Sequence, residues 1–390
     1  MNRIRKLKMG MIGGGPKAFI GSIHRQATRL TGQIELVAGA FSGDPDKSVK
    51  TGMELGLSKE RIYLTYEEMV EKEAELPPSE RIDFVAITTP NHLHFPMAKA
   101  FLEAGFNVMC EKPMTITVDE ALRLRDIVIK SGSVFGLMHN YSGYPMVKLA
   151  RDIIKDTEFG AVRKVIVHYQ QDWLSQPIEA DGQKQALWRT DPAQSGPTGS
   201  MGDIGTHAEN LIEYLTGLTI TQVCADVATF LPNRRLDDDG NCLLRFDNGA
   251  KGVLHESQIA VGEENNLAIW VYGENMGIEW HQETPNYLNV KVKNEPEQIW
   301  KRGNAYVGEK SPAADRATRL PSGHPEGFIE AFANVYANFS DTILAKINNN
   351  IPDELMLDFP NVEDGLRGMR FIEAVVKSSK SNKKWIAMNH

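Results

Sequence analysis

Short apolar runs alternate with longer amphipathic segments over the first 140 residues. The runs are nearly continuous and rich in bulky or β-branched residues, which is typical of strands covered on both faces. They predict strands at residues 7–12, 34–41, 84–88, 107–110 and 134–139. The segments between them predict helices at 16–31, 66–75, 95–104 and 118–131. This alternation predicts an α/β domain built of parallel βαβ units around a doubly wound sheet.

After Tyr141 the pattern changes to strand-like runs separated by turn signals. Strands are predicted at 162–173, 223–231, 242–246, 252–259, 267–272 and 287–292, with hairpin turns at 247–249 and 273–275. Helices are predicted at 144–156, at 203–216 and towards the C-terminus, and a loop at 175–200. We therefore expect two domains: residues 1–140, and an α+β domain of residues 141–390 with an open, mainly antiparallel sheet. The C-terminal helices are expected to pack back on the first domain.

The composition agrees with two globular domains, since 390 residues exceed the usual size of one. Hydrophobic residues make up 42% of the chain, which is enough to build cores. No apolar run approaches the roughly 18 residues of a membrane span, and the net charge of −8 argues against a nucleic-acid binder. Cys110, Cys224 and Cys242 are too few and too dispersed for a disulfide framework or a zinc motif. We expect a cytoplasmic protein without a metal.

A glycine-rich turn, Gly13-x-Gly15-x-x-Ala18, lies between the first predicted strand and the first helix, with Pro16 near the first helical position. In this context it matches the dinucleotide-binding fingerprint, whose glycines allow a tight turn and close approach of the backbone to a pyrophosphate. The following helix offers unpaired N–H groups to the phosphates. A purely structural turn is the alternative.

The second predicted strand ends close to Ser42 and Asp44, where such folds place an acid that bonds the adenosine ribose of NAD. Asp44 comes late for this role, and Ser42 is compatible with either a ribose or a phosphate. Lys47 would suit a 2′-phosphate, or it simply lies at the start of a helix. We expect NAD as the cofactor, with NADP as the alternative.

Two further motifs follow predicted strands, at the edge where ligands of doubly wound sheets bind. They are Thr89-Pro90-Asn91-His92-Leu93-His94 and Glu111-Lys112-Pro113. His92 and His94 lack a carboxylate or cysteine at ligand spacing, so we expect this motif to line the cofactor rather than to bind a metal. Lys112 precedes a proline, which disfavours helical conformation. On sequence alone its commonest role is that of a solvated loop cation.

Asp203 and His207 are four residues apart, so on a helix their side chains share one face. This spacing suggests an acid–imidazole pair, and a helix N-cap is the alternative for Asp203. Two other histidine-containing segments have plain interpretations. His24-Arg25 and residues 323–327 are candidates for closing the substrate pocket. The preferred interpretations are the surface of the first helix for His24-Arg25 and a helix N-terminal turn for 323–327.

Together with Trp188-Arg189, these motifs resemble the Gfo/Idh/MocA (glucose–fructose oxidoreductase/inositol dehydrogenase) family over nearly the whole chain. The resemblance implies an N-terminal Rossmann domain and a C-terminal α/β domain whose open sheet carries the substrate site. That sheet often also forms an interface, so a homo-oligomer, dimer or tetramer, is expected. The resemblance further implies that Lys112, Asp203 and His207 form the catalytic group and that Trp188 and Arg189 lie near the cofactor.

One segment departs from the family pattern, because many members carry an Arg-rich segment where this chain has Asn140 and its neighbours. Asn140 is the expected replacement that reaches the nicotinamide ribose. The expected cofactor-binding residues are therefore Gly13, Gly15, Pro16, Ala18, Ser42, Thr89, Pro90, Asn91, His94, Glu111, Lys112, Asn140, Trp188 and Arg189.

The expected reaction is hydride transfer between nicotinamide and a ring hydroxyl of a sugar or glycoside, with C3 as a candidate position. An imidazole suits a general base near neutrality, so His207 is assigned that role, and Asp203 would orient it or bond a neighbouring hydroxyl. Lys112 would bond the reacting oxygen and stabilise developing alkoxide charge. Trp173 and Lys184 are candidates for further sugar contacts, since indoles and polar groups suit polyhydroxylated rings.

Two other functions use parts of the same pattern. An NAD-dependent glycosidase, for example a sulfoquinovosidase-like enzyme, would use transient C3 oxidation, elimination and water addition with no net NADH. A non-catalytic, dinucleotide-sensing regulator would need the glycine turn but not the proton-handling residues. Either enzymatic function requires the ammonium of Lys112 and the imidazole of His207 to act beside one nicotinamide.

Overall fold

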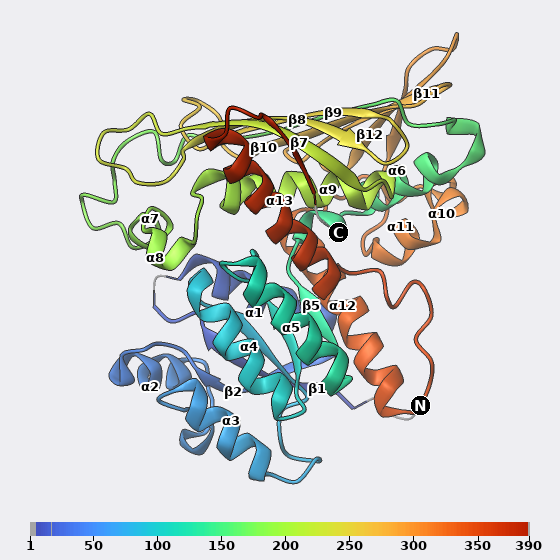
Figure 1. Cartoon of the computed structure of the whole chain (residues 1–390). Helices are drawn as coiled ribbons and strands as arrows, with labels where there is room; N and C mark the ends of the chain where they lie inside the picture. The colour runs from blue at the N-terminus through green and yellow to red at the C-terminus, as the bar shows by residue number, and fades with distance from the viewer. Residues whose placement is uncertain (1–4, 17, 389–390) are drawn as a thin grey trace. The chain divides into compact units, whose positions relative to one another are not determined.

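The computed structural model describes residues 5–16 and 18–388, which form two compact units. The first unit contains residues 5–115, 119–140 and 328–366. The second contains residues 116–118, 141–327 and 367–388. Both units are built from segments that are far apart in the sequence (Figure 1).

The first unit contains a five-stranded parallel sheet with the strand order β2-β1-β3-β4-β5. The strands are β1 (Leu7–Gly13), β2 (Ile34–Ala40), β3 (Phe84–Thr88), β4 (Asn107–Cys110) and β5 (Phe135–Leu137). The helices are α1 (Phe19–Thr31), α2 (Pro45–Glu54), α3 (Tyr66–Glu75), α4 (His94–Glu103), α5 (Val118–Ser131) and α12 (Phe328–Ile347). The predicted doubly wound α/β sheet is confirmed.

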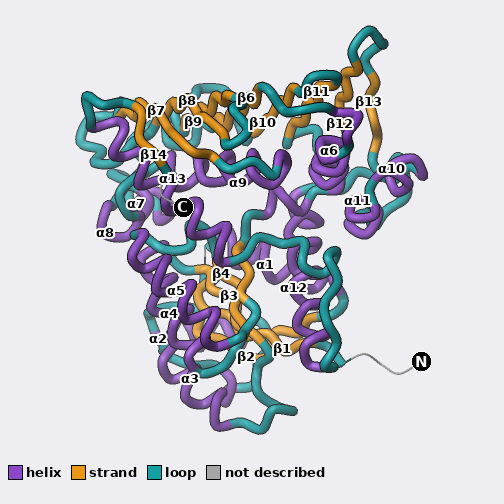
Figure 2. The backbone as a smooth tube through the Cα atoms, turned by 45° about the vertical axis from the view of Figure 1, so that its right-hand side comes forward, coloured by secondary structure: helices purple, strands orange, loops and turns teal. Residues whose placement is uncertain are grey.

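Helices flank the strands of this unit, as Figure 2 shows. On one face, Met9 and Met11 of β1 belong to a core that also contains Phe332 and Phe339 of α12. On the other face, a Cβ added to Gly10 would meet Met69 of α3 at 2.2 Å. Both faces of β1 are therefore covered, which explains why its sequence is apolar without alternation.

The second unit contains a nine-stranded sheet with the strand order β13-β12-β11-β10-β6-β9-β8-β7-β14. Only the central pair, β6 with β9, is parallel among the pairs of this sheet. The strands are β6 (Lys164–Gln170), β7 (Ile220–Ala228), β8 (Asp239–Phe246), β9 (Lys251–Ser257), β10 (Asn266–Tyr272), β11 (Met276–His281), β12 (Tyr287–Val292), β13 (Gln298–Lys301) and β14 (Trp385–Ala387). The mainly antiparallel sheet and both predicted hairpins, β8–β9 and β10–β11, are confirmed.

The remaining helices are α6 (Pro145–Lys155), α7 (Lys184–Arg189), α8 (Pro192–Ser195), α9 (Thr206–Thr216), α10 (Ala305–Lys310), α11 (Pro312–Ala317) and α13 (Val362–Lys380). Figure 1 shows α6 and α9 on the same face of the sheet. Side chains of β6 alternate strictly between buried and half-buried, and its buried set is Val165, Val167 and Tyr169. One face of this strand therefore packs on the core, as period-two alternation requires.

No helix within the described ranges is both long and apolar enough to cross a membrane.

Several element predictions are wrong in detail. The first helix begins at Phe19 rather than at Pro16, because Gly15 accepts a hydrogen bond from the N–H of Ala18 in a tight turn. The strands β11, β13 and β14 and the helices α10 and α11 were not predicted, and the loop at 175–200 contains α7 and α8. The helix α2 was raised only as an alternative, through the helix start at Lys47. For α2 a signal existed, since Asp44 and Pro45 are a typical N-cap and first residue.

Candidate active site

The glycine-rich turn follows β1 and lies against the ends of two neighbouring strands. Gly13 has a φ of +81°, and a Cβ on it would lie 2.8 Å from the carbonyl oxygen of Thr88, the last residue of β3. A Cβ on Gly15 would lie 2.6 Å from the carbonyl oxygen of Phe41, just after β2. Both positions therefore require glycine for the turn to pack, whatever it binds.

Several groups of the first unit fit a nucleotide. The N-cap of α1, Ala18, offers no side-chain cap, and the first turn of the helix has no acidic residue that would repel a phosphate. The guanidinium of Arg25 donates to the carbonyl oxygen of Gly14 at 2.9 Å. In the described part of the chain, the buried Nδ2 of Asn140 has no hydrogen-bond partner. A buried donor of this kind needs an acceptor, which a ribose or an amide of a bound dinucleotide would supply.

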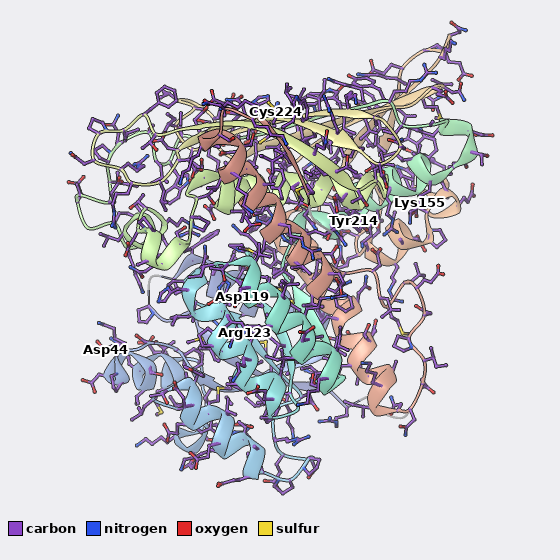
Figure 3. All side chains as sticks on the ribbon, in the orientation of Figure 1. Asp44, Asp119, Arg123, Lys155, Tyr214 and Cys224 are labelled. Carbon is purple, nitrogen blue, oxygen red and sulfur yellow. The ribbon has the colours of Figure 1, made fainter. Side chains whose placement is uncertain are left out.

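The residues after β2 are arranged around the start of α2. Asp44 is the N-cap of this helix and lies at its exposed beginning (Figure 3). The side chain of Lys47 approaches the Asp44 carboxylate at 2.6 Å, and hydrogen bonds from Lys47 lower the pKa of Asp44. Lys47 is therefore the helix-start residue that the sequence allowed, with its charge already paired. Ser42, whose hydroxyl accepts the N–H of Asp44, remains the predicted contact to a ribose or phosphate.

The motif of residues 89–94 contacts the Glu-Lys-Pro turn through His94. The two ring nitrogens of this buried histidine lie 2.8 Å from the carbonyl oxygen of Pro113 and 2.9 Å from that of Thr89. Burial lowers the pKa of His94. A neutral ring donates to only one of these two oxygens, but main-chain oxygens face both nitrogens, so we expect His94 to shape the cofactor site rather than to touch the cofactor. Pro90 and the buried Asn91 begin the short 3₁₀ helix Asn91–Leu93 in front of α4.

The interpretation of His24 as a helix-surface residue is wrong. Its side chain is fully buried, with Nδ1 2.5 Å from the hydroxyl of Tyr336 and Nε2 2.7 Å from Oε1 of Glu111. The other carboxylate oxygen of Glu111 accepts the main-chain N–H of Lys112 at 3.2 Å. Lys112 itself is half-buried. The predicted catalytic lysine therefore follows a carboxylate that is bonded to a buried histidine.

In the second unit, Asp203 lies in a π-helical turn, Met201–Gly205, that leads into α9. The prediction of a regular helix from residue 203 is therefore wrong here, and the N-cap alternative is excluded because Ser200 occupies that position. Gly205 permits the turn, since a Cβ on it would meet the sulfur of Met201 at 2.4 Å. Single π-helical turns of this kind are frequent at functional sites.

The carboxylate of Asp203 is held by two donors from distant segments. Its Oδ2 accepts Nε of Arg189 at 3.1 Å and Nε2 of Gln258 at 2.8 Å. The guanidinium carbon of Arg189 lies 4.2 Å from the ring centre of Trp188 and 5.7 Å from that of Trp173, within cation–π range. This cluster brings together four residues that the sequence predicted and Gln258, which it missed. Lys184 is the exposed first residue of α7.

His207 is the second residue of α9 and packs on two buried tyrosines. The ring centre of Tyr141 lies 4.8 Å from that of His207, edge to face, and that of Tyr169 lies at 6.4 Å. The tyrosine hydroxyls are 2.5 Å apart, and each also bonds the amide of Asn265. Burial raises the pKa of Tyr141 to about 12 and that of Tyr169 well above its ordinary value. Both phenols are therefore neutral near pH 7 and act as hydrogen-bonding supports.

Within the described ranges, no group of three or more His, Cys, Asp or Glu side chains is arranged to hold a metal ion. The site chemistry is instead that of hydrogen-bond donors and acceptors around an imidazole. Gln258, Tyr169 and Asn265 were not predicted as part of it. Tyr169 lies in β6, whereas Gln258 directly follows β9 and Asn265 directly precedes β10. Local pattern predicts these strands, but not which side chains from their ends meet at one place.

The two units together define an NAD-binding oxidoreductase, and the chain belongs to the Gfo/Idh/MocA family. Residues 7–139 match the oxidoreductase family with an NAD-binding Rossmann fold, and residues 147–279 match the GFO/IDH/MocA C-terminal domain. NAD is accordingly the cofactor of the first unit.

Three relatives illustrate this membership. An oxidoreductase structure from Sinorhizobium meliloti is 43% identical with a TM-score of 0.87, covering 98% of this chain and 99% of its own. An inositol dehydrogenase homologue from Azotobacter vinelandii, complexed with NADH and myo-inositol, is 33% identical with a TM-score of 0.90, covering 98% of both chains. Levoglucosan dehydrogenase of Pseudarthrobacter phenanthrenivorans is 28% identical, covering 82% of this chain and 85% of its own.

Proposed function

We propose that the protein is an NAD-dependent dehydrogenase that oxidises a ring hydroxyl of an uncharged cyclic polyol or sugar. The observation that carries this is the hydrogen-bonding cluster around Asp203, next to the chain segment that supplies His207. A relative in complex with NADH and myo-inositol, and a relative named levoglucosan dehydrogenase, support the substrate class.

The charges of the cluster favour an uncharged substrate. Arg189 is a cation that contacts Asp203, and its charge is balanced by that carboxylate at 3.1 Å. Its guanidinium also lies close to the two indole rings. An anionic substrate would have to compete with Asp203 for this cation. Amide and carboxylate groups such as those of Gln258 and Asp203 instead suit hydroxyls, which both donate and accept.

The residues have distinct roles in this reaction. NAD, held at the glycine turn, would supply the hydride acceptor. His207 takes the hydroxyl proton, with Tyr141 packed on its ring to limit the ring's orientations. Asp203 orients the substrate by bonding a neighbouring hydroxyl. Lys112 bonds the reacting oxygen and stabilises the negative charge that develops on it.

The test is NAD reduction measured over a panel of myo-inositol, levoglucosan, D-xylose and glucose 6-phosphate. We expect activity with an uncharged member of the panel and a weaker response to the phosphate. Lys112→Ala and His207→Asn should each lower kcat by about 10²–10⁴-fold, with the dissociation constant of NAD nearly unchanged. Lys99→Ala is the matched control, because Lys99 is a surface residue paired with Glu103 on α4.

Near-wild-type activity of Lys112→Ala would refute its assignment. A parallel assay with aryl glycosides separates net oxidation from redox-assisted hydrolysis. Release of aglycone without accumulation of NADH would replace the dehydrogenase by a glycosidase that uses the same residues. Binding of NAD without turnover of any substrate in either assay would favour a sensor.

A further inference from the structure

A buried chain of hydrogen bonds runs through the first unit and ends at the Glu-Lys-Pro turn. It links the hydroxyl of Tyr336 on α12, both ring nitrogens of His24 on α1, the carboxylate of Glu111 and the main-chain N–H of Lys112. The side chains of His24 and Glu111 are 0% and 9% exposed. Three segments that are distant in sequence thus meet at the residue just before Lys112.

The protons of this chain have one consistent arrangement. Among the described residues, the hydrogen bond of the Tyr336 hydroxyl is to His24, so Tyr336 donates to Nδ1. A neutral His24 then carries its proton on Nε2 and donates it to an ionised Glu111. A protonated His24 would donate at both nitrogens and leave the Tyr336 proton without an acceptor. In this arrangement Glu111 accepts from His24 through Oε1 and from the main-chain N–H of Lys112 through Oε2.

The other side of the turn is held by His94. Its ring nitrogens lie 2.8 Å from the carbonyl oxygen of Pro113 and 2.9 Å from that of Thr89, just after β3, and a neutral ring donates to one of these two oxygens. Glu111 and Pro113 flank Lys112, and each is fixed by a buried imidazole from a different helix. The main chain of Lys112 is thereby held from both sides, whereas its own side chain is half-buried.

We propose that His24 is a positioning residue for Lys112, acting through the carboxylate of Glu111 and supported by Tyr336. This inference rests on the proposed function, in which Lys112 bonds the reacting oxygen. A misplacement of a catalytic group by about 1 Å can cost about 10²-fold in rate. A purely apolar residue would fill the site of His24 without fixing Glu111, and a buried polar group is costly unless it is fully paired.

The test compares two substitutions that differ in one hydrogen bond. His24→Leu removes the donor to Glu111, whereas the amide of His24→Gln reaches in the direction of Nε2 and retains it. With the best substrate of the panel, we expect His24→Leu to lower kcat by roughly 10–100-fold, with the KM for NAD nearly unchanged. His24→Gln should recover most of this loss.

A second measurement does not depend on turnover. The ε-amine of Lys112 is acetylated in the protein without added cofactor, and its rate is followed by mass spectrometry relative to Lys99. If His24 positions the turn, the relative rate at Lys112 changes severalfold in His24→Leu and Glu111→Gln, and much less in His24→Gln. The double variant of His24→Leu and Glu111→Gln should resemble either single variant, since both remove the same link.

Phe339→Leu is the control variant for effects that come only from a loss of stability. Phe339 lies on α12 three residues after Tyr336 and packs on Phe84 and Phe359, and its side chain takes no part in the hydrogen bonds of His24. It should lower Tm without changing the acetylation of Lys112. Equal kcat and equal acetylation in His24→Leu and wild type would overturn the positioning role. If instead Lys112→Ala proves fully active while His24→Leu alters acetylation, the proposed function fails and the positioning of the turn stands.

Discussion

Substitution of Tyr141 by phenylalanine tests the support beneath His207. Three hydrogen bonds form a closed ring in this region. The Nδ2 of Asn265 donates to the hydroxyl of Tyr141 at 3.3 Å, and the hydroxyl of Tyr169 donates to Oδ1 of Asn265 at 2.7 Å. The hydroxyl of Tyr141 therefore donates to that of Tyr169, at 2.5 Å. Tyr141→Phe keeps the ring on His207 but opens this arrangement.

The expected loss of stability follows from the buried polar groups that Tyr141→Phe leaves without a hydrogen-bond partner. A buried polar group without a partner costs about 1–3 kcal/mol. We expect the lower part of this range, because Asn265 is half-buried and Nε2 of Gln171 already lies 3.5 Å from the hydroxyl of Tyr169. The free energy of unfolding should fall by about 1–2 kcal/mol, which for a unit of this size lowers Tm by about 2–8 °C.

Urea titration at pH 7 and a thermal scan measure this loss directly. Tyr141→Leu also removes the ring that contacts His207 at 4.8 Å, so it should lower kcat more than Tyr141→Phe does. A Tyr141→Phe protein as stable as the wild type would refute the hydrogen-bonded ring. Equal kcat in the two variants would show that the tyrosine ring does not orient His207.

Two further predictions concern single contacts, one at Gly15 and one at Glu279. Gly15→Ala places a Cβ 2.6 Å from the carbonyl oxygen of Phe41, so the turn must shift. Titration with NAD should therefore show an affinity weakened by about tenfold or more. An affinity equal to that of the wild type would contradict the observed packing. Burial alone would raise the pKa of Glu279, but hydrogen bonds from Lys291 at 2.6 Å and from His281 outweigh it and lower this pKa to about 2. Because the folded-state pKa lies below the unfolded value, Glu279 stabilises the protein above pH 4.5 and this contribution disappears as the pH falls towards 2. The stability difference between wild type and Glu279→Gln, from urea titrations, should therefore vanish near pH 2, and a pH-independent difference would contradict this.

Much of the fold could be predicted because its signals are local. The apolar runs of β1 and β3 are continuous since both faces of these strands are covered, and glycines mark the turn that follows β1. The hairpins at 247–249 and 273–275 were predictable from turn residues flanked by strand-like runs. Spacing alone also suggested the pair Asp203 and His207, although the π-helical turn that carries Asp203 has no signal in periodicity.

The partners of these residues are a matter of tertiary structure. His24 looks like a surface residue of an amphipathic helix until α12 packs on α1 and brings Tyr336, 312 positions later, to its ring. Likewise, Asp203 meets Arg189 from α7 and Gln258 from just after β9. The sequence by itself determined most of the strands, the glycine turn and the chemical types of the site residues, because these depend on neighbours within a few positions. Only the folded chain decided which buried polar groups share hydrogen bonds, because each needs a partner and the packing of distant segments selects it.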